Sequence, residues 1–115
     1  MSNLFKAFFI TSILFAASAA QAAELVMIDQ RACTYCSKFR NDIAPTYNST
    51  AAGQVAPLRT VSVLKKWPAD LAGVKRARFT PVFIVVDKGR EVGRFAGYTN
   101  PNTFWAKLNP LLGTL

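Results

Sequence analysis

The sequence predicts an α/β domain in which a four-stranded mixed sheet is flanked by helices. Short apolar or β-branched segments alternate with helix-like segments along residues 23–115. A helical segment connects the first two predicted strands, which should therefore run parallel, because parallel neighbours need a crossover connection. A tight turn connects the last two, which should run antiparallel. Both connections fit within one mixed sheet with helices on both faces.

The first 22 residues have the composition of a secretory signal peptide. Lys6 precedes an uncharged apolar run over 7–20, and Ala20-Gln21-Ala22 has the small-x-small pattern of a cleavage site. A run of about 14 residues is shorter than the roughly 20 that cross a bilayer. We therefore predict a cleaved signal peptide at 1–22, export of the protein, and one domain at 23–115. An uncleaved N-terminal anchor is the alternative.

The first predicted strand and helix flank the cysteines. Residues 25–28 (LVMI) are a short apolar run, which favours a buried strand. A helix is predicted from Cys36, with apolar side chains at every fourth position. These side chains are Phe39, Ile43 and Tyr47. Pro45 should kink or end this helix, and 48–54 should be fraying helix and loop.

The second half of the chain predicts a short helix between strands. Residues 58–63 (LRTVSV) are rich in β-branched residues and predict a strand. Residues 67–74 (WPADLAGV) predict a short helix with Pro68 near its first turn. Residues 82–86 (VFIVV) are continuously apolar, as expected of a central strand.

The last predicted elements are a more exposed strand and a C-terminal helix. Residues 87–90 (DKGR) have turn chemistry and lead into an alternating strand at 91–96. Asn100 and Pro101 are suited to the N-cap and first position of a helix. The apolar residues of that helix are Phe104, Trp105, Leu108, Leu111 and Leu112.

The composition excludes several classes of chemistry. The chain contains no histidine, so acid–base catalysis by His, Cys–His nucleophile pairs and His-containing metal sites are excluded. Two cysteines cannot complete a four-coordinate zinc site within one chain. We therefore predict no metal site.

The chain is strongly basic. Without residues 1–22 it carries 13 Lys and Arg against 6 Asp and Glu, since Lys6 is the one charged residue removed. We predict no nucleic-acid partner, because an exported domain rarely meets nucleic acid and the cations are not interleaved with aromatic residues. The densest cluster is Lys75, Arg76 and Arg78. It forms either a solvated face or a docking patch for an acidic partner protein.

Cys33 and Cys36 are the two cysteines of the chain, and three roles are open to them. As a structural staple, a disulfide closing such a short loop contributes on the order of 2 kcal/mol, less than longer loops do. As a metal clip, the pair would suit a soft ion such as Cu(I), but Met27 is the one other soft ligand after residue 22. The third role is a reactive couple.

The position of the pair favours the reactive couple. Cys33 is predicted where the first strand ends and the helix begins, so free backbone N–H groups and the positive helix end favour a thiolate there. Arg31 adds a nearby cation. We expect a depressed pKa and a nucleophilic sulfur at Cys33. Cys36, one turn into the helix, should face inward and resolve a mixed disulfide formed at Cys33.

A strand, a C-x-x-C pair, a helix containing Pro45, and Thr80-Pro81 before a central strand together resemble the thioredoxin family. The resemblance covers essentially all of residues 23–115, and -CTYC- is more similar to glutaredoxins than to thioredoxin -CGPC-. Closer similarity is to the SoxS-type periplasmic thioredoxins of the sulfur-oxidation (Sox) system. The segments that carry it are IAPTY (43–47), APLR (56–59), WPADL (67–71), FTPVFIVVDKGREVGRFAGY (79–98) and FW (104–105).

The resemblance implies a periplasmic, monomeric thiol–disulfide oxidoreductase with a thioredoxin fold. Cys33 would attack and Cys36 resolve, with their redox-active disulfide in place of any cofactor. Pro81 would be a cis-proline facing the pair, and Thr80 would offer its backbone to an extended substrate. The remaining residues implied to meet the substrate are Thr34, Tyr35, Gly97 and Tyr98. The implied partners are a protein thiol or disulfide, such as a sulfur-oxidation carrier protein, and a membrane thiol-electron transporter as donor.

One feature departs from the family pattern. Thioredoxins bury an acid behind the resolving cysteine and pair it with a lysine on the next strand. Here Asp29 lies four residues before Cys33 and is expected to be a strand-end residue, while the strand at 58–63 offers Arg59 and no lysine. A different class of function also stays open: a non-catalytic binding module that uses the Thr80-Pro81 groove and has a structural Cys33–Cys36 disulfide.

Overall fold

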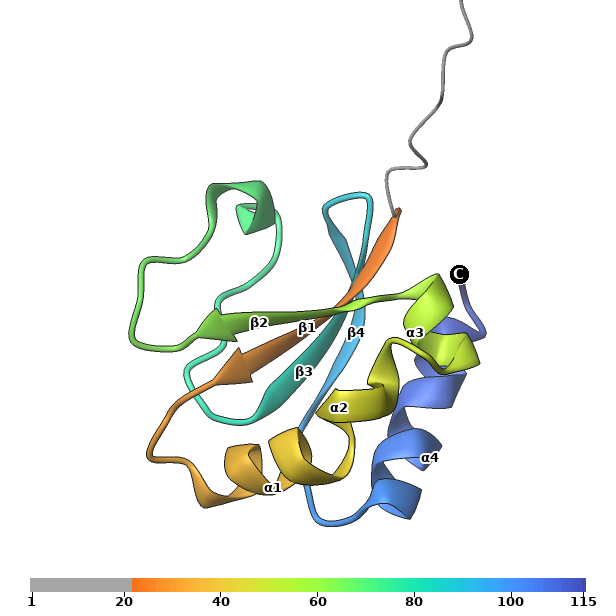
Figure 1. Cartoon of the computed structure of the whole chain (residues 1–115). Helices are drawn as coiled ribbons and strands as arrows, with labels where there is room; N and C mark the ends of the chain where they lie inside the picture. The colour runs from red at the N-terminus through yellow and green to blue at the C-terminus, as the bar shows by residue number, and fades with distance from the viewer. Residues whose placement is uncertain (1–21) are drawn as a thin grey trace, which may run out of the picture.

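The computed structural model describes residues 22–115, so the predicted signal peptide lies, apart from Ala22, outside the described residues. The sheet has the strand order β2-β1-β3-β4 (Figure 1). β1 runs parallel to β2 and antiparallel to β3, and β3 runs antiparallel to β4. The predicted four-stranded mixed sheet is therefore confirmed. Its strands are β1 (Ala23–Asp29), β2 (Leu58–Ser62), β3 (Val82–Asp87) and β4 (Arg90–Ala96).

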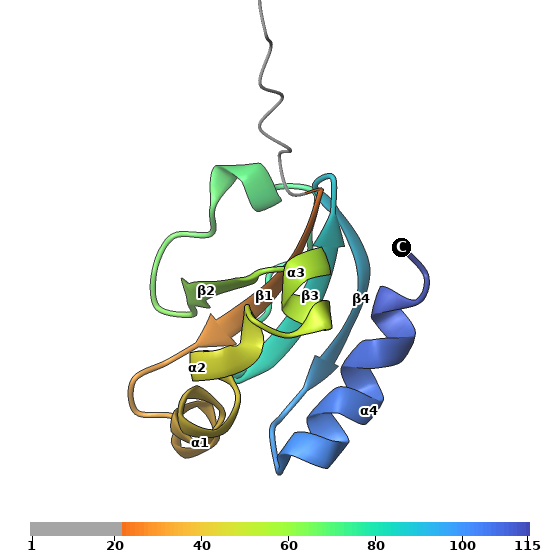
Figure 2. The ribbon, with the colours of Figure 1, turned by 45° about the vertical axis from the view of Figure 1, so that its right-hand side comes forward.

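Four α-helices cover one face of this sheet (Figure 2). They are α1 (Thr34–Asp42), α2 (Ala44–Tyr47), α3 (Ala51–Val55) and α4 (Pro101–Leu112). The rings of Phe39 and Phe83 lie 4.7 Å apart between centroids, and Phe104 lies 5.2 Å from each of them. This aromatic cluster joins α1 and α4 to β3, so it fixes the helix that carries the cysteines against the sheet.

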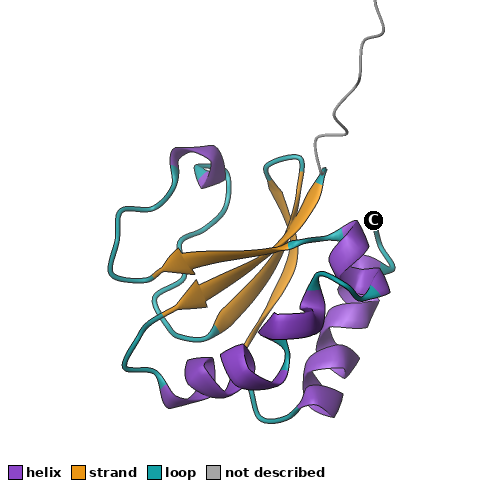
Figure 3. Cartoon of the chain, in the orientation of Figure 1, coloured by secondary structure: helices purple, strands orange, loops and turns teal. Residues whose placement is uncertain are grey.

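The opposite face is covered by coil and one turn of 3-10 helix, Ala69–Leu71 (Figure 3). Leu71 and Val74 pack there against Val26 and Ile84 of the sheet. The prediction of a helix over 67–74 was therefore too long. Pro68 has an extended ψ of 139°, which delays the helix start. The indole N–H of Trp67 and the backbone N–H of Val74 both donate to the Leu71 carbonyl, at 2.8 and 2.9 Å.

The structure divides the helical region after the cysteines differently from the prediction. As Pro45 predicted, α1 ends at Asp42 and a separate short helix begins at Ala44. The segment 48–54 was expected to be frayed, but it contributes most of α3. Thr50 caps that helix, because its hydroxyl oxygen accepts the Gly53 N–H at 3.0 Å.

The β3–β4 turn and the start of α4 follow the prediction. Lys88 and Gly89 both have positive φ angles, 51° and 77°, as a two-residue hairpin turn of this hand requires. The Asn100 side chain accepts the Thr103 N–H at 2.9 Å, and Pro101 occupies the first turn. Local sequence chemistry therefore determines the β3–β4 turn and the start of α4 within the C-terminal β-β-α unit.

Candidate active site

Three chain segments leave the sheet at the same end. Ile28 of β1 pairs with Val82 of β3, which pairs in turn with Ala96 of β4. Consequently three loops follow or precede strands at this end of the sheet, namely 30–33, 79–81 and 97–99 (Figure 1). The Gly97 N–H donates to the Pro81 carbonyl at 2.8 Å and links two of these segments directly. The sheet thus collects most of the predicted site residues at one end of the domain.

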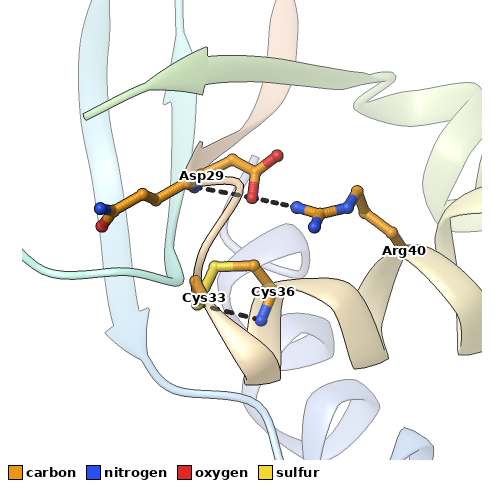
Figure 4. Close-up of a disulfide and its surroundings, with 5 residues drawn as sticks. Asp29, Cys33, Cys36 and Arg40 are labelled. Atoms are coloured by element: carbon orange, nitrogen blue, oxygen red, sulfur yellow. Dashed lines mark hydrogen bonds and ion pairs between the residues drawn. A yellow bond between two sulfur atoms is a disulfide. The ribbon is translucent and has the colours of Figure 1, made fainter. Parts of the chain in front are cut away.

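Cys33 and Cys36 form a disulfide at the start of α1 (Figure 4). Cys33 is the N-cap residue, and its Sγ accepts the backbone N–H of Cys36 at 3.1 Å. The Cys33 carbonyl accepts the Ser37 N–H at 3.0 Å. The sulfur and the carbonyl of Cys33 are thus both hydrogen-bonded to backbone N–H groups of α1. The predicted placement of Cys33 at the strand–helix junction is confirmed.

The two sulfurs differ in accessibility. Cys33 is partly exposed, whereas Cys36 is 0% exposed and belongs to the core cluster between the helices and the sheet. A backbone N–H and the positive end of a helix stabilise negative charge on a sulfur at the N-cap. The geometry therefore suits thiol–disulfide exchange. In that reaction the accessible Cys33 sulfur reacts with another molecule, and the buried Cys36 sulfur then reacts with Cys33.

Asp29 ends β1 beside this pair, as predicted from its position. One oxygen of its carboxylate accepts the Gln30 N–H at 2.8 Å and also binds the guanidinium of Arg40 on α1. Figure 4 shows the Asp29 and Arg40 side chains pointing toward one another next to the disulfide. Sequence reasoning did not identify Arg40. Its spacing of four residues from Cys36, which places both on one side of α1, was the available signal.

Arg59, the cation noted on the second strand, is engaged elsewhere. Its guanidinium donates to both oxygens of Asp70, at 2.5 and 2.9 Å, and lies 3.2 Å from Glu24. Hydrogen bonding to Arg59 lowers the pKa of Asp70, and the same contact raises the pKa of Arg59. Arg59 pairs in register with Val26, three positions from the level of Asp29. Arg59 therefore stabilises a part of the sheet that is remote from the cysteines.

The predicted substrate contacts fall into exposed and buried groups. Thr34 and Tyr35 are exposed, and the Tyr35 side chain is 58% accessible. The Thr80-Pro81 peptide bond is cis, as predicted, with Thr80 partly exposed and Pro81 buried. Among residues 22–115, no backbone group hydrogen-bonds to the N–H or carbonyl of Thr80. These groups are free to pair with an extended peptide.

Gly97 and Tyr98 play different parts at this edge. Gly97 has a φ of 83°, a conformation that favours glycine. The Tyr98 side chain is 3% exposed and packs edge-on against Phe39. Its hydroxyl donates to Asp42 at 2.8 Å, and burial, reinforced by this hydrogen bond, raises the pKa of Tyr98 to about 12. The predicted substrate contact at Tyr98 can therefore involve its backbone alone.

Phe79 is an exposed residue of this edge that sequence reasoning passed over. Its side chain is 78% accessible, and it lies two positions before Pro81.

Within residues 22–115 no cluster of three or more His, Cys, Asp or Glu side chains is suited to a metal ion. No helix of that same region combines the length and apolar character needed to span a bilayer.

Comparison with known proteins identifies the family. A model of the thioredoxin-like domain matches residues 14–111. The crystal structure of reduced periplasmic thioredoxin SoxS from Paracoccus pantotrophus superposes with a TM-score of 0.75 at 33% identity, covering 79% of this chain and 96% of that one. A comparison with curated proteins gave no significant match. With its thioredoxin fold and its C-x-x-C disulfide, the chain belongs to the thioredoxin-like family.

Proposed function

We propose that this protein is a thiol–disulfide oxidoreductase that reduces a disulfide of a partner protein. The observation that carries the proposal is the asymmetry of the pair. Cys33 is partly exposed at a helix N-cap with an N–H directed at its sulfur, and Cys36 is fully buried behind it. Thiol–disulfide exchange needs one accessible, stabilised thiolate and one resolving thiol.

In the reducing direction, the Cys33 thiolate attacks one sulfur of the partner disulfide. A Cys33–partner disulfide forms and the second partner sulfur leaves as a thiolate. The Cys36 thiol then loses its proton and attacks Cys33, which forms the intramolecular disulfide and releases the first partner sulfur. Two electrons pass to the partner, whose thiolates take up protons from solvent. A dithiol donor must then reduce Cys33–Cys36 again.

The surroundings of the pair support binding of an extended partner segment. Thr34 and Tyr35 would contact it from the turn between the cysteines, and the free backbone groups of Thr80 would pair with it. Pro81 and Gly97 would form the adjoining surface, held together by their hydrogen bond. Substrate recognition is thus assigned to the three segments at one sheet edge.

Two further observations support a proposed location and pathway. Residues 1–22 have the features of a secretory leader, and the similar SoxS structure is that of a periplasmic thioredoxin. We therefore place the protein in the periplasm as a monomer. Its proposed partner is a carrier-protein cysteine of a sulfur-oxidation system, with a membrane thiol-electron transporter as the donor.

The equilibrium potential of the Cys33–Cys36 pair tests the function directly. We expect a value below about −200 mV in glutathione or dithiothreitol buffers, in the range of reducing thioredoxin-type proteins. A value near −120 mV would instead assign an oxidant. A bond that persists in strong reductant while the fold is intact would support the alternative, a binding module with a structural disulfide.

A trapping experiment identifies the attacking sulfur. The Cys36→Ser variant lacks the resolving thiol, so it should accumulate a mixed disulfide through Cys33 with a disulfide-containing peptide. The matched Cys33→Ser variant retains the buried thiol and should trap little, because Cys36 is 0% exposed. Equal trapping by both variants would contradict the assigned roles.

A further inference from the structure

A groove of about 610 Å³ lies between the coil 75–79 and strand β4. This volume is within the range of about 300–1,000 Å³ that is typical of ligand sites. Val82, the first residue of β3, is among its lining residues. The cationic groove, as we name it, is defined by Lys75, Arg76, Arg78, Phe79 and Arg94.

The cations of this groove carry unbalanced charge. The ion pairs formed within residues 22–115 involve Arg40, Arg59 and Arg94, and none involves Lys75, Arg76 or Arg78. Glu91 is the one acid that lines the groove, and it is paired with Arg94. Three positive groups of one short segment are therefore left to interact with a negative partner.

Part of this charge is held in place by the fold. The Arg76 guanidinium donates to the carbonyls of Val63 and Lys65, at 3.2 Å each. The Arg94 guanidinium donates to the Lys75 carbonyl at 2.7 Å, which fixes the coil against β4. Arg94 is balanced by Glu91, whereas the contacts of Arg76 use backbone acceptors alone and leave its positive charge unbalanced.

The groove also has an apolar anchor and adjoins the redox site. Phe79 is among its lining residues and exposes most of its ring. Exposed aromatic and arginine side chains together are typical of protein interfaces. From Phe79 the chain continues through Thr80 to Pro81. The Pro81 carbonyl is hydrogen-bonded to Gly97 at the end of the sheet where the cysteines lie. An extended segment bound at Thr80 would therefore enter the groove.

We propose that the cationic groove docks an acidic, extended segment of the partner protein next to the disulfide that is to be reduced. This inference rests on the proposed function and adds the charge of the substrate to it. Opposite charges across an interface raise the association rate, and the effect weakens as salt screens them. The partner segment would place carboxylates against Lys75 and Arg78, since the Arg76 guanidinium is bound to the carbonyls of Val63 and Lys65, outside the groove.

The test compares two synthetic cyclic peptides that share one disulfide. One carries Asp and Glu beside the cysteines, and the other carries Asn and Gln at the same positions. The second-order rate of their reduction by the reduced protein is measured at low and at high sodium chloride. We expect the acidic peptide to react about tenfold faster at low salt, with the difference largely lost at high salt.

Two variants locate the effect. Lys75→Gln with Arg78→Gln removes two cations whose side chains form no ion pair within residues 22–115, and leaves Arg76 and its hydrogen bonds intact. Arg90→Gln with Lys107→Gln is the matched control, with the same loss of charge outside the groove. The groove variant should lose the preference for the acidic peptide, while the control should keep it.

Each outcome has a distinct meaning. If neither peptide is reduced, the proposed function fails. If both are reduced equally at low salt, or if the two variants slow equally, the function stands and the docking proposal is overturned. Vesicles of phosphatidylglycerol are the last probe. Binding that depends on Lys75 and Arg78, without discrimination between the peptides, would assign the groove to an anionic membrane surface and overturn the proposal.

Discussion

Asp29 and Arg40 form an ion pair that joins the last residue of β1 to the last turn of α1. Cys33 and Cys36 lie between these two anchor points in the chain. The Asp29 side chain is 16% exposed and that of Arg40 is 36% exposed, so the pair is partly shielded from solvent on the Asp29 side. It connects the strand and the helix whose relative position determines where the disulfide lies.

Breaking this pair should reduce stability. We expect a coupling free energy of about 1 kcal/mol between Asp29→Asn and Arg40→Gln in a double-mutant cycle, at the upper end of values for exposed pairs. Denaturant unfolding of the four proteins, all with the disulfide formed, measures it. Arg90→Gln serves as a control, because Arg90 forms no ion pair within residues 22–115. A coupling near zero would mean that the pair does not hold the junction.

Gly53 should not tolerate a side chain. A Cβ atom there would lie 2.0 Å from the Tyr47 carbonyl oxygen and 2.6 Å from the Cα of Asn48, and both are backbone atoms that cannot simply rotate away. We expect Gly53→Ala to lower the free energy of unfolding by about 3 kcal/mol.

Gly113 provides the matched control for Gly53. It has a φ of −66°, and an added Cβ would meet its nearest atoms at 3.5 Å or more. Gly113→Ala should therefore be neutral or stabilise by up to about 1 kcal/mol. Urea unfolding of both variants tests this pair of expectations, and similar effects at the two sites would contradict them.

Substitutions of Phe104 and Phe79 should distinguish a ring that packs in the core from a ring that is available for docking. Phe104 is buried and contacts the rings of Phe39, Phe83 and Trp105, so Phe104→Ala should destabilise by about 3–5 kcal/mol. Phe79→Ala removes an exposed ring and should change stability by less than about 0.5 kcal/mol. Thermal unfolding checks both. A large loss of stability for Phe79→Ala would mean that this ring supports the fold.

The elements that were predicted correctly have strong local signals. The apolar run of β3, the turn residues before β4 and the Asn100 cap before α4 each determine their structure within a few residues. The cysteine pair was also placed correctly, because a short strand followed directly by a helix leaves Cys33 at the junction.

The features that were missed depend on contacts between distant segments. α3 is the exception, because its cap Thr50 and the close approach of Gly53 to the Tyr47 backbone are contacts between residues near in the chain. The Asp29–Arg40 pair depends on the angle between β1 and α1. The inward orientation of Tyr98 depends on the aromatic cluster and on Asp42, which lies 56 residues earlier in the chain.

Tyr98 should make stability depend on pH in the alkaline range. Burial and the hydrogen bond to Asp42 raise the pKa of Tyr98 to about 12 in the folded protein, above the value of about 10 for an exposed tyrosine. Below pH 10 the phenol is protonated in both states, so its full contribution to stability is present. Between pH 10 and 12 the unfolded state loses this proton while the folded state keeps it, so stability falls as pH rises.

The Tyr98→Phe variant isolates this effect. At pH 8 it should be less stable than the parent protein by about 1 kcal/mol, because the hydrogen bond to Asp42 is lost. Above pH 10 this difference should narrow, since phenylalanine has no proton to lose. Part of the alkaline slope should remain, because burial also raises the pKa of Tyr47. Urea unfolding between pH 8 and 11.5 measures both proteins, and a constant difference over that range would contradict the assignment to Tyr98.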